Sequence, residues 1–120
     1  MNTSTTGALA EEQAAHYLTQ KRYRVLARNF RATGGEIDIV SFWKKTLVFV
    51  EVKERASNAF GGPIAAVTPT KQKRVVHAAL QFIKQNKNLS YDSIRFDVIC
   101  ILPTSLEHIE NAFVPARMTL

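Results

Sequence analysis

Two short segments of this sequence alternate apolar and polar residues with a period of two, which is the pattern of β-strands with two distinct faces. They are residues 34–40 and 48–53, and the polar residues 43–46 between them are few enough for a hairpin turn. The sequence therefore predicts an antiparallel strand pair around which the rest of the chain folds.

A tight turn centred on Lys44 and Lys45 sets the register of this predicted hairpin. It pairs Phe42 with Leu47, Val40 with Phe49, Asp38 with Glu51 and Glu36 with Lys53. The charged residues then share one face, and Ile37 and Ile39 point to the other. A three-residue loop or a β-bulge would shift the pairing.

Facing side chains on one sheet face have Cβ atoms about 4.5–5.5 Å apart, so Asp38 and Glu51 would repel each other. A divalent cation removes this repulsion, because hard cations take carboxylate oxygens as ligands. The pattern therefore favours a catalytic or metal-binding patch formed by Asp38, Glu51 and Lys53, with Glu36 beside it. The alternative is a solvated strand face.

The composition is that of one ordinary globular domain. Of the 120 residues, 46% are hydrophobic and 22% are charged, and no apolar segment is long enough to span a membrane. The net charge of +6 favours a polyanionic partner, with nucleic acid first. The single Cys100 fits a reduced, cytoplasmic setting, and residues 1–5 are expected to be a disordered tail rather than a signal peptide.

Residues 6–20 are predicted to form a first helix, in which Glu11 shares the buried stripe with Ala14 and Leu18. A carboxylate on such a face needs a partner. The alternative is a Glu at the helix start whose carboxylate reaches solvent. A strand over residues 23–29 follows, and Arg31, which flanks its exit, is a candidate nucleic-acid-binding residue.

A second helix is predicted from Thr68, a capping residue followed by proline, to about Asn86. Gln72 lies on its inner stripe and is a candidate supporting residue of the acidic patch. The basic residues near its start are Lys71, Lys73 and Arg74. Cations at a helix start oppose the helix dipole, so they suggest contact with phosphate, although a solvated basic turn is the alternative. Arg55 is likewise interpreted either as a phosphate contact or as a solvated side chain. It lies in a loop over residues 54–63 that is expected to be mobile.

Residues 93–102 are almost wholly apolar, which predicts a buried strand with a parallel neighbour reached across the second helix. Asp97 in this strand is interpreted as structural. Residues 105–120 are expected to form a short edge strand or packed coil. The three histidines lack metal-ligand spacing, so each is interpreted as a surface or core residue.

Asp38 followed by Glu51-Val52-Lys53 on a hairpin resembles the PD-(D/E)xK signature of the restriction-endonuclease-like nuclease superfamily. Further blocks along nearly the whole chain resemble the YraN-like family of small bacterial proteins. They are Gly7-x-x-x-Glu11-x-x-Ala14, Asn29-Phe30-Arg31, Gly35-Glu36-Ile37-Asp38, Phe49-Val50-Glu51-Val52-Lys53-x-Arg55, Phe60-Gly61-x-Pro63, Lys71, Arg95-Phe96-Asp97-Val98 and Asn111-Ala112-Phe113. The family is similar to archaeal Holliday-junction resolvases and is described as predicted endonucleases. One departure is Ile37, which stands where the superfamily has proline.

The resemblance implies an α/β fold with a restriction-endonuclease-like mixed central sheet flanked by helices, as a single nuclease-like domain over residues 1–120. It implies Asp38, Glu51 and Lys53 as catalytic residues, and Glu11, Asp38 and Glu51 as ligands of Mg²⁺ or Mn²⁺. The expected function is metal-dependent hydrolysis of phosphodiester bonds in DNA, with branched DNA as one candidate substrate. Resolvases act as dimers, so a homodimer is also implied. The alternatives are a nucleic-acid-binding module with a vestigial metal site, and a scaffold protein whose positive charge aids solubility.

Overall fold

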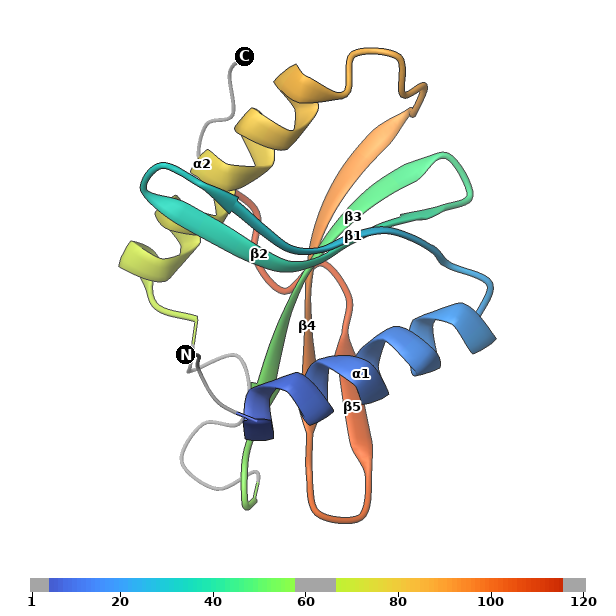
Figure 1. Cartoon of the computed structure of the whole chain (residues 1–120), viewed down its shortest axis with the longest axis vertical. Helices are drawn as coiled ribbons and strands as arrows, with labels where there is room; N and C mark the ends of the chain where they lie inside the picture. The colour runs from blue at the N-terminus through green and yellow to red at the C-terminus, as the bar shows by residue number, and fades with distance from the viewer. Residues whose placement is uncertain (1–4, 58–66, 116–120) are drawn as a thin grey trace.

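The computed structural model of the chain describes residues 5–57 and 67–115. Within them, two helices and five strands follow in the order α1, β1, β2, β3, α2, β4 and β5 (Figure 1). Their bounds are α1 Thr5–Gln20, β1 Arg24–Ala32, β2 Gly35–Trp43, β3 Thr46–Glu54, α2 Pro69–Gln85, β4 Ser93–Ile101 and β5 Leu106–Ile109. The expected tail lies outside the described residues except for Thr5, at which α1 begins, and most of the expected mobile loop lies outside them as well.

The strands form one mixed sheet in the order β1-β2-β3-β4-β5, which confirms the predicted α/β class. β3 and β4 are parallel and are joined through α2, as expected for a buried strand reached by a helical crossover. β5 pairs antiparallel with β4, so the short edge strand is also confirmed. Thr68 caps α2 and accepts a hydrogen bond from the Lys71 amide, and Pro69 begins the helix.

The β2–β3 hairpin has the predicted turn. Lys44 and Lys45 both have positive φ, 49° and 65°, as the two central residues of a type I′ turn require. Phe42 faces Leu47 and Val40 faces Phe49, so the predicted register is confirmed for this part of the hairpin. The turn chemistry therefore aligns the strands that carry the acidic residues.

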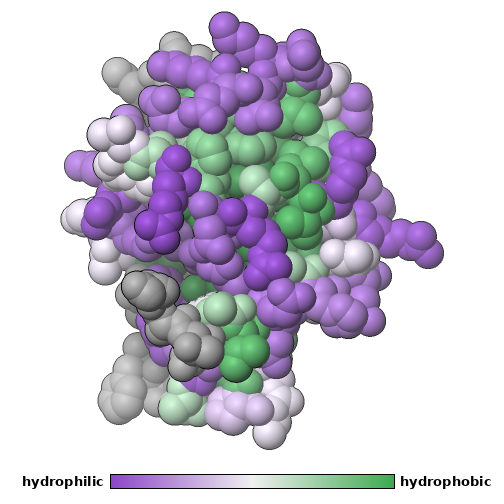
Figure 2. Space-filling view, in the orientation of Figure 1, coloured by the Kyte–Doolittle hydropathy of each residue, from purple (hydrophilic) through white to green (hydrophobic). Residues whose placement is uncertain are grey.

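The two helices cover opposite faces of the sheet. Along β3, Leu47 and Phe49 belong to the core cluster that contains α2, and Val48 and Val50 belong to the cluster that contains α1. Because successive strand residues point to opposite faces, the alternation places the helices on different sides. Figure 2 shows hydrophilic residues over most of one side of the molecule, with apolar side chains grouped between them.

Two glycines allow the β1–β2 hairpin to reach α2. Gly34 has φ +85°, a conformation that L side chains rarely adopt. A Cβ on Gly35 would collide with the backbone carbonyl of Arg74. Gly34 therefore supplies a positive φ, and Gly35 lets the hairpin backbone pack directly against the α2 backbone.

The expectation that Ile37 and Ile39 point the same way is wrong. Ile37 lies in the α2 cluster and Ile39 in the α1 cluster, although both are fully buried. The ladder between β2 and β3 extends from the turn only to Ile39 and Val50. Beyond this point the β1–β2 ribbon leaves β3 and turns toward α2 (Figure 1), so strict alternation relative to the sheet ends there.

Candidate functional site

Asp38 and Glu51 lie where β2 and β3 separate. The predicted backbone pairing of these two residues falls one position beyond the last paired residues, Ile39 and Val50. In its place, the Val52 amide donates a hydrogen bond of 2.8 Å to Asp38 Oδ2. The Asp38 carboxylate therefore takes the position of a strand partner and links β2 to β3 through its side chain.

Glu51 is a buried carboxylate with incomplete pairing. Its residue surface is 2% exposed, and Oε1 lies 3.4 Å from the ammonium of Lys71 on α2. Among the described residues, Glu51 Oε2 has no hydrogen-bond partner. Such an atom is costly to bury, so an unpaired carboxylate oxygen at this depth indicates a place for a cationic ligand or a proton.

The environment raises the pKa of both carboxylates. Burial, followed by the charge of Asp38, raises the pKa of Glu51 to about 7, and Lys71 and Lys53 oppose the rise. Burial also raises the pKa of Asp38, against the hydrogen bond from the Val52 amide and the charges of the same two lysines. Because one pair of ammonium groups acts on both carboxylates, Asp38 and Glu51 belong to a single electrostatic site.

Glu11 joins this site from α1. It is 9% exposed, which confirms its predicted inward position, and its Oε1 accepts a hydrogen bond of 2.9 Å from Asn29 Nδ2. Arg28 lies 3.8 Å from the same oxygen. Burial and then the charge of Asp38 raise the pKa of Glu11, against the Asn29 hydrogen bond. Glu11 and Asp38 line one cavity of about 330 Å³ together with Glu36.

Asp38 is thus the central acid of the three predicted metal ligands. Its charge acts on Glu11 on one side and on Glu51 on the other. Within residues 5–57 and 67–115, no three Asp, Glu, His or Cys side chains are grouped closely enough to hold a metal ion as they stand. Oxygen ligands suited to a hard cation are present, but these side chains would have to shift to enclose one.

The amine nearest the acids comes from a different element than predicted. Lys53 is half-buried and its charge acts on Asp38 and Glu51, but the ion pair with Glu51 is made by Lys71. The predicted pairing of Lys53 with Glu36 lies beyond the β2–β3 ladder. Glu36 instead faces Arg31 on β1, and their side chains are 3.8 Å apart.

Three of the five residues predicted to bind nucleic acid gather in one place. Arg31, Lys71 and Arg74 line a second cavity, next to Glu36. Lys73 lines a separate apolar cavity on α2, and Arg55 lines another beyond the end of β3. Gln72, predicted as a supporting residue, donates a hydrogen bond of 3.1 Å to the Val67 carbonyl at the start of α2, which is a structural contact.

Sequence reasoning assigned no role to Asn29, which positions Glu11. Asn29 has φ 53°, an uncommon conformation for a residue within a strand. It directs its side-chain amide to the Glu11 carboxylate. The available signal was an asparagine at a strand position, since asparagine tolerates positive φ better than most residues.

Asp97 forms a separate buried network, as its structural interpretation suggested. Arg95 donates two hydrogen bonds to its carboxylate, of 2.9 and 2.8 Å, and the Asn111 amide donates one of 2.9 Å. His108 Nε2 lies 2.7 Å from Asp97 Oδ2, and Tyr17 bonds the other ring nitrogen. The network ties β4 to β5 and α1, so His108 is a core residue with a specific partner.

The fold and the site together define an α/β domain with a mixed five-stranded sheet and buried carboxylates next to cationic side chains. The family model for the uncharacterised protein family UPF0102 matches residues 10–101. The chain belongs to this family, which is the YraN-like family that its sequence resembles. Glu11, Asp38 and Glu51 all lie within the matched range.

Similar proteins match nearly the whole chain. A UPF0102 protein of Geobacter sulfurreducens is 48% identical over 112 residues, covering 89% of this chain and 87% of its own. One of Geobacter metallireducens is 44% identical over 117 residues, covering 94% and 95%. One of a Sulfurihydrogenibium species is 40% identical over 113 residues, covering 94% and 97%. In the described part of this chain, neither helix has the length and apolar character needed to cross a membrane.

Proposed function

We propose that this chain is a metal-dependent endonuclease that hydrolyses phosphodiester bonds in DNA, with a restriction-endonuclease-like domain. The proposal rests on one observation: the charges of Lys53 and Lys71 act on both Asp38 and Glu51, and one buried oxygen of Glu51 has no partner among the described residues. A fold selected only for stability gains nothing from two neighbouring carboxylates whose pKa values are both raised. This arrangement suits a site that binds a cation.

The carboxylate oxygens of the site are ligands of the kind that Mg²⁺ and Mn²⁺ prefer. Asp38 and Glu51 would hold the ion, and Glu11 would supply a further oxygen from α1, because all three offer the hard ligands that these cations prefer. A bound divalent cation supplies Lewis-acid activation of water and neutralises charge on the phosphate. Glu51 provides one unpaired carboxylate oxygen, Oε2, for this role, and Asp38 provides a carboxylate that the Val52 amide already orients.

The lysines have distinct roles in the proposal. Lys53 follows Glu51 by two residues on β3, so it lies near the carboxylates and would stabilise negative charge that develops on the phosphate oxygens. Lys71 neutralises Glu51 from α2. The net charge of +6 would attract the nucleic-acid backbone without reading its sequence, and Arg31 and Arg74 lie beside the acidic site to receive it.

A nicking assay on branched and linear DNA, with Mg²⁺, with Mn²⁺ and with EDTA, tests the proposal. We expect cation-dependent nicking that falls at least about 100-fold in Asp38→Asn and in Lys53→Met. Asp92→Asn, an exposed carboxylate outside the site, is the matched control and should retain activity. Nicking that persists in both site variants would refute the proposal.

A second candidate is a nucleic-acid-binding module without turnover. The Lys71–Glu51 ion pair favours it, because it already balances part of the buried charge, and the carboxylates of the described residues are not grouped as a complete ligand set. Salt-dependent DNA binding without nicking in any divalent cation would support this candidate over the endonuclease.

A further inference from the structure

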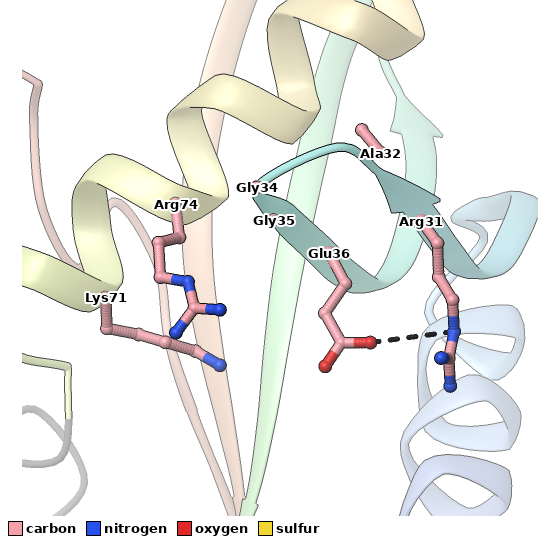
Figure 3. A pocket seen from close by; sticks show the side chains of 7 residues that line it. All are labelled: Arg31, Ala32, Gly34, Gly35, Glu36, Lys71 and Arg74. Atoms are coloured by element: carbon pink, nitrogen blue, oxygen red, sulfur yellow. Dashed lines mark ion pairs between the residues drawn. The ribbon is translucent and has the colours of Figure 1, made fainter.

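A cationic pocket lies between the tip of the β1–β2 hairpin and α2. It has a volume of about 320 Å³. We call it the cationic pocket and define it by Arg31, Gly34, Gly35, Glu36, Lys71 and Arg74. Figure 3 shows Lys71 and Arg74 extending from α2 toward the side on which Glu36 and Arg31 extend from the hairpin.

The side chains of the pocket suit an anion. Three cationic groups face one carboxylate, Glu36, whose pair with Arg31 has a length of 3.8 Å and joins side chains that are 50% and 75% exposed. An exposed pair of this kind is worth little, so an incoming anion can replace Glu36 at Arg31. Among the described residues, no carboxylate pairs with Arg74.

The glycines leave one wall of the pocket without side chains. Gly34 and Gly35 form the hairpin tip, and the backbone there already touches α2 at Arg74. The amide of Lys71 bonds Thr68 Oγ1 and the amide of Gln72 bonds the Thr68 carbonyl. Recognition of an anion here therefore rests on the three cationic side chains rather than on these amides.

Lys71 belongs to both the cationic pocket and the acidic site. Its ammonium lies 3.4 Å from Glu51 Oε1, and its side chain also lines the pocket. The other oxygen of Glu51, buried and without a partner among the described residues, is free to take a cation. A cation on Glu51 would compete with Lys71 and release the ammonium toward the pocket.

We propose that the cationic pocket binds one phosphate group of a nucleic acid beside the acidic site, and that Lys71 alternates between Glu51 and this phosphate. The inference rests on the proposed function, since it places a second phosphate of the same substrate. Arg74 and Arg31 hold the phosphate, and Lys71 joins them when Glu51 no longer requires its charge. The phosphate is either an internal phosphodiester or a terminal phosphomonoester, which share this chemistry.

Binding of a labelled DNA duplex in EDTA, followed by fluorescence anisotropy, tests the pocket without turnover. Arg31→Met and Arg74→Met should each weaken binding about tenfold and lower the slope of log affinity against log salt by about one, because these two arginines hold the phosphate while Lys71 remains on Glu51. Lys84→Met, an exposed lysine in the last turn of α2, is the matched control and should change neither. Equal effects in the control, or no effect in the pocket variants, would overturn the inference.

Duplexes with and without 5′-phosphates distinguish the two sources of phosphate. An equal loss on both duplexes assigns the pocket to an internal phosphodiester, and a loss only on the phosphorylated duplex assigns it to a terminal phosphate. Either result supports the pocket.

The shared role of Lys71 is tested by Glu51→Gln, again in EDTA. Releasing Lys71 should strengthen duplex binding by up to about fivefold, and this gain should disappear in the Lys71→Met background. A gain of the same size in both backgrounds would reflect general charge repulsion and would overturn the alternation.

The same variants separate the two proposals. Pocket-dependent binding without nicking in any cation would refute the endonuclease and keep the pocket. The opposite result would be nicking that requires Asp38, with both nicking and DNA binding unchanged in Arg31→Met and in Arg74→Met. This result would refute the pocket and keep the endonuclease.

Discussion

The ammonium of Lys71 reaches from α2 to within 3.4 Å of Glu51 Oε1, at the point where β2 and β3 separate. This contact balances only one oxygen of a buried carboxylate whose pKa is raised to about 7. The site is therefore incompletely neutralised, and its protonation, its cation binding and its effect on stability are linked.

The buried Glu51 should make the metal-free protein less stable as pH rises. A carboxyl whose pKa is raised on folding contributes stability that is present below its unfolded value, 4.5, and is lost by about pH 7. The free energy of unfolding of the wild type in EDTA should fall across this range by up to about 3 kcal/mol more than that of Glu51→Gln. Urea denaturation from pH 4.5 to 8 measures the difference.

Glu107→Gln is the control for this titration, since Glu107 is an exposed carboxylate on β5. Its pH profile should follow the wild type. A Glu51→Gln profile that also follows the wild type would show that the Glu51 carboxylate ionises as it does in the unfolded chain.

Binding of Mn²⁺ should strengthen with pH in the same range. A cation requires ionised carboxylates, so the proton on Glu51 competes with it below about pH 7. We expect the Mn²⁺ affinity measured by isothermal titration calorimetry to fall about tenfold per pH unit below this value. Affinity independent of pH between 5 and 8 would place the Mn²⁺ site elsewhere.

Gly35→Ala should destabilise the protein, because the new methyl group would meet the Arg74 carbonyl in the α2 backbone. Overpacking against backbone costs about 1–3 kcal/mol, which thermal unfolding would detect as a lower midpoint. Thr33→Ala, at the exposed turn beside it, should change the midpoint little. Unchanged stability in Gly35→Ala would mean that the hairpin does not rest on α2.

Asp97→Asn should be strongly destabilising. Burial alone would raise the pKa of Asp97, but the hydrogen bonds from His108, Arg95 and the Asn111 amide lower it below its usual value. Breaking a buried ion pair costs about 3–5 kcal/mol. A lowered carboxyl pKa stabilises the fold above pH 3.8, and this contribution is lost as the pH falls through the folded value.

Asp92→Asn, an exposed residue just before β4, is the matched control in a urea unfolding experiment. Equal destabilisation by the two variants would argue against the buried network around Asp97.

The hairpin could be predicted from sequence because its information is local. The alternation in both strands and the turn at Lys44 and Lys45 specify the register near the turn, and the structure has that register. The separation of β2 from β3 on the N-terminal side of Ile39 could not be predicted from sequence, because it depends on the packing of the β1–β2 tip against α2. The opposite placement of Ile37 and Ile39 follows from that separation.

The acidic site was predictable in its carboxylates but not in its nearest amine. Glu11 was identified by its place on a helical stripe of small residues, and its burial confirms that inference. Lys71 was recognised in a basic helix start and among the residues that resemble the family, but not as the partner of Glu51, because this contact depends on how α2 crosses the sheet. The partnership of His108 with Asp97 likewise required the position of β5 against β4.

The most direct test of a cation held by Asp38 and Glu51 is anomalous diffraction from a crystal soaked in Mn²⁺ above pH 7. The account predicts a strong anomalous peak between these two carboxylates, which Asp38→Asn abolishes. A peak at another place would contradict the account. So would the lack of a peak between these carboxylates at a Mn²⁺ concentration that saturates other sites in the crystal.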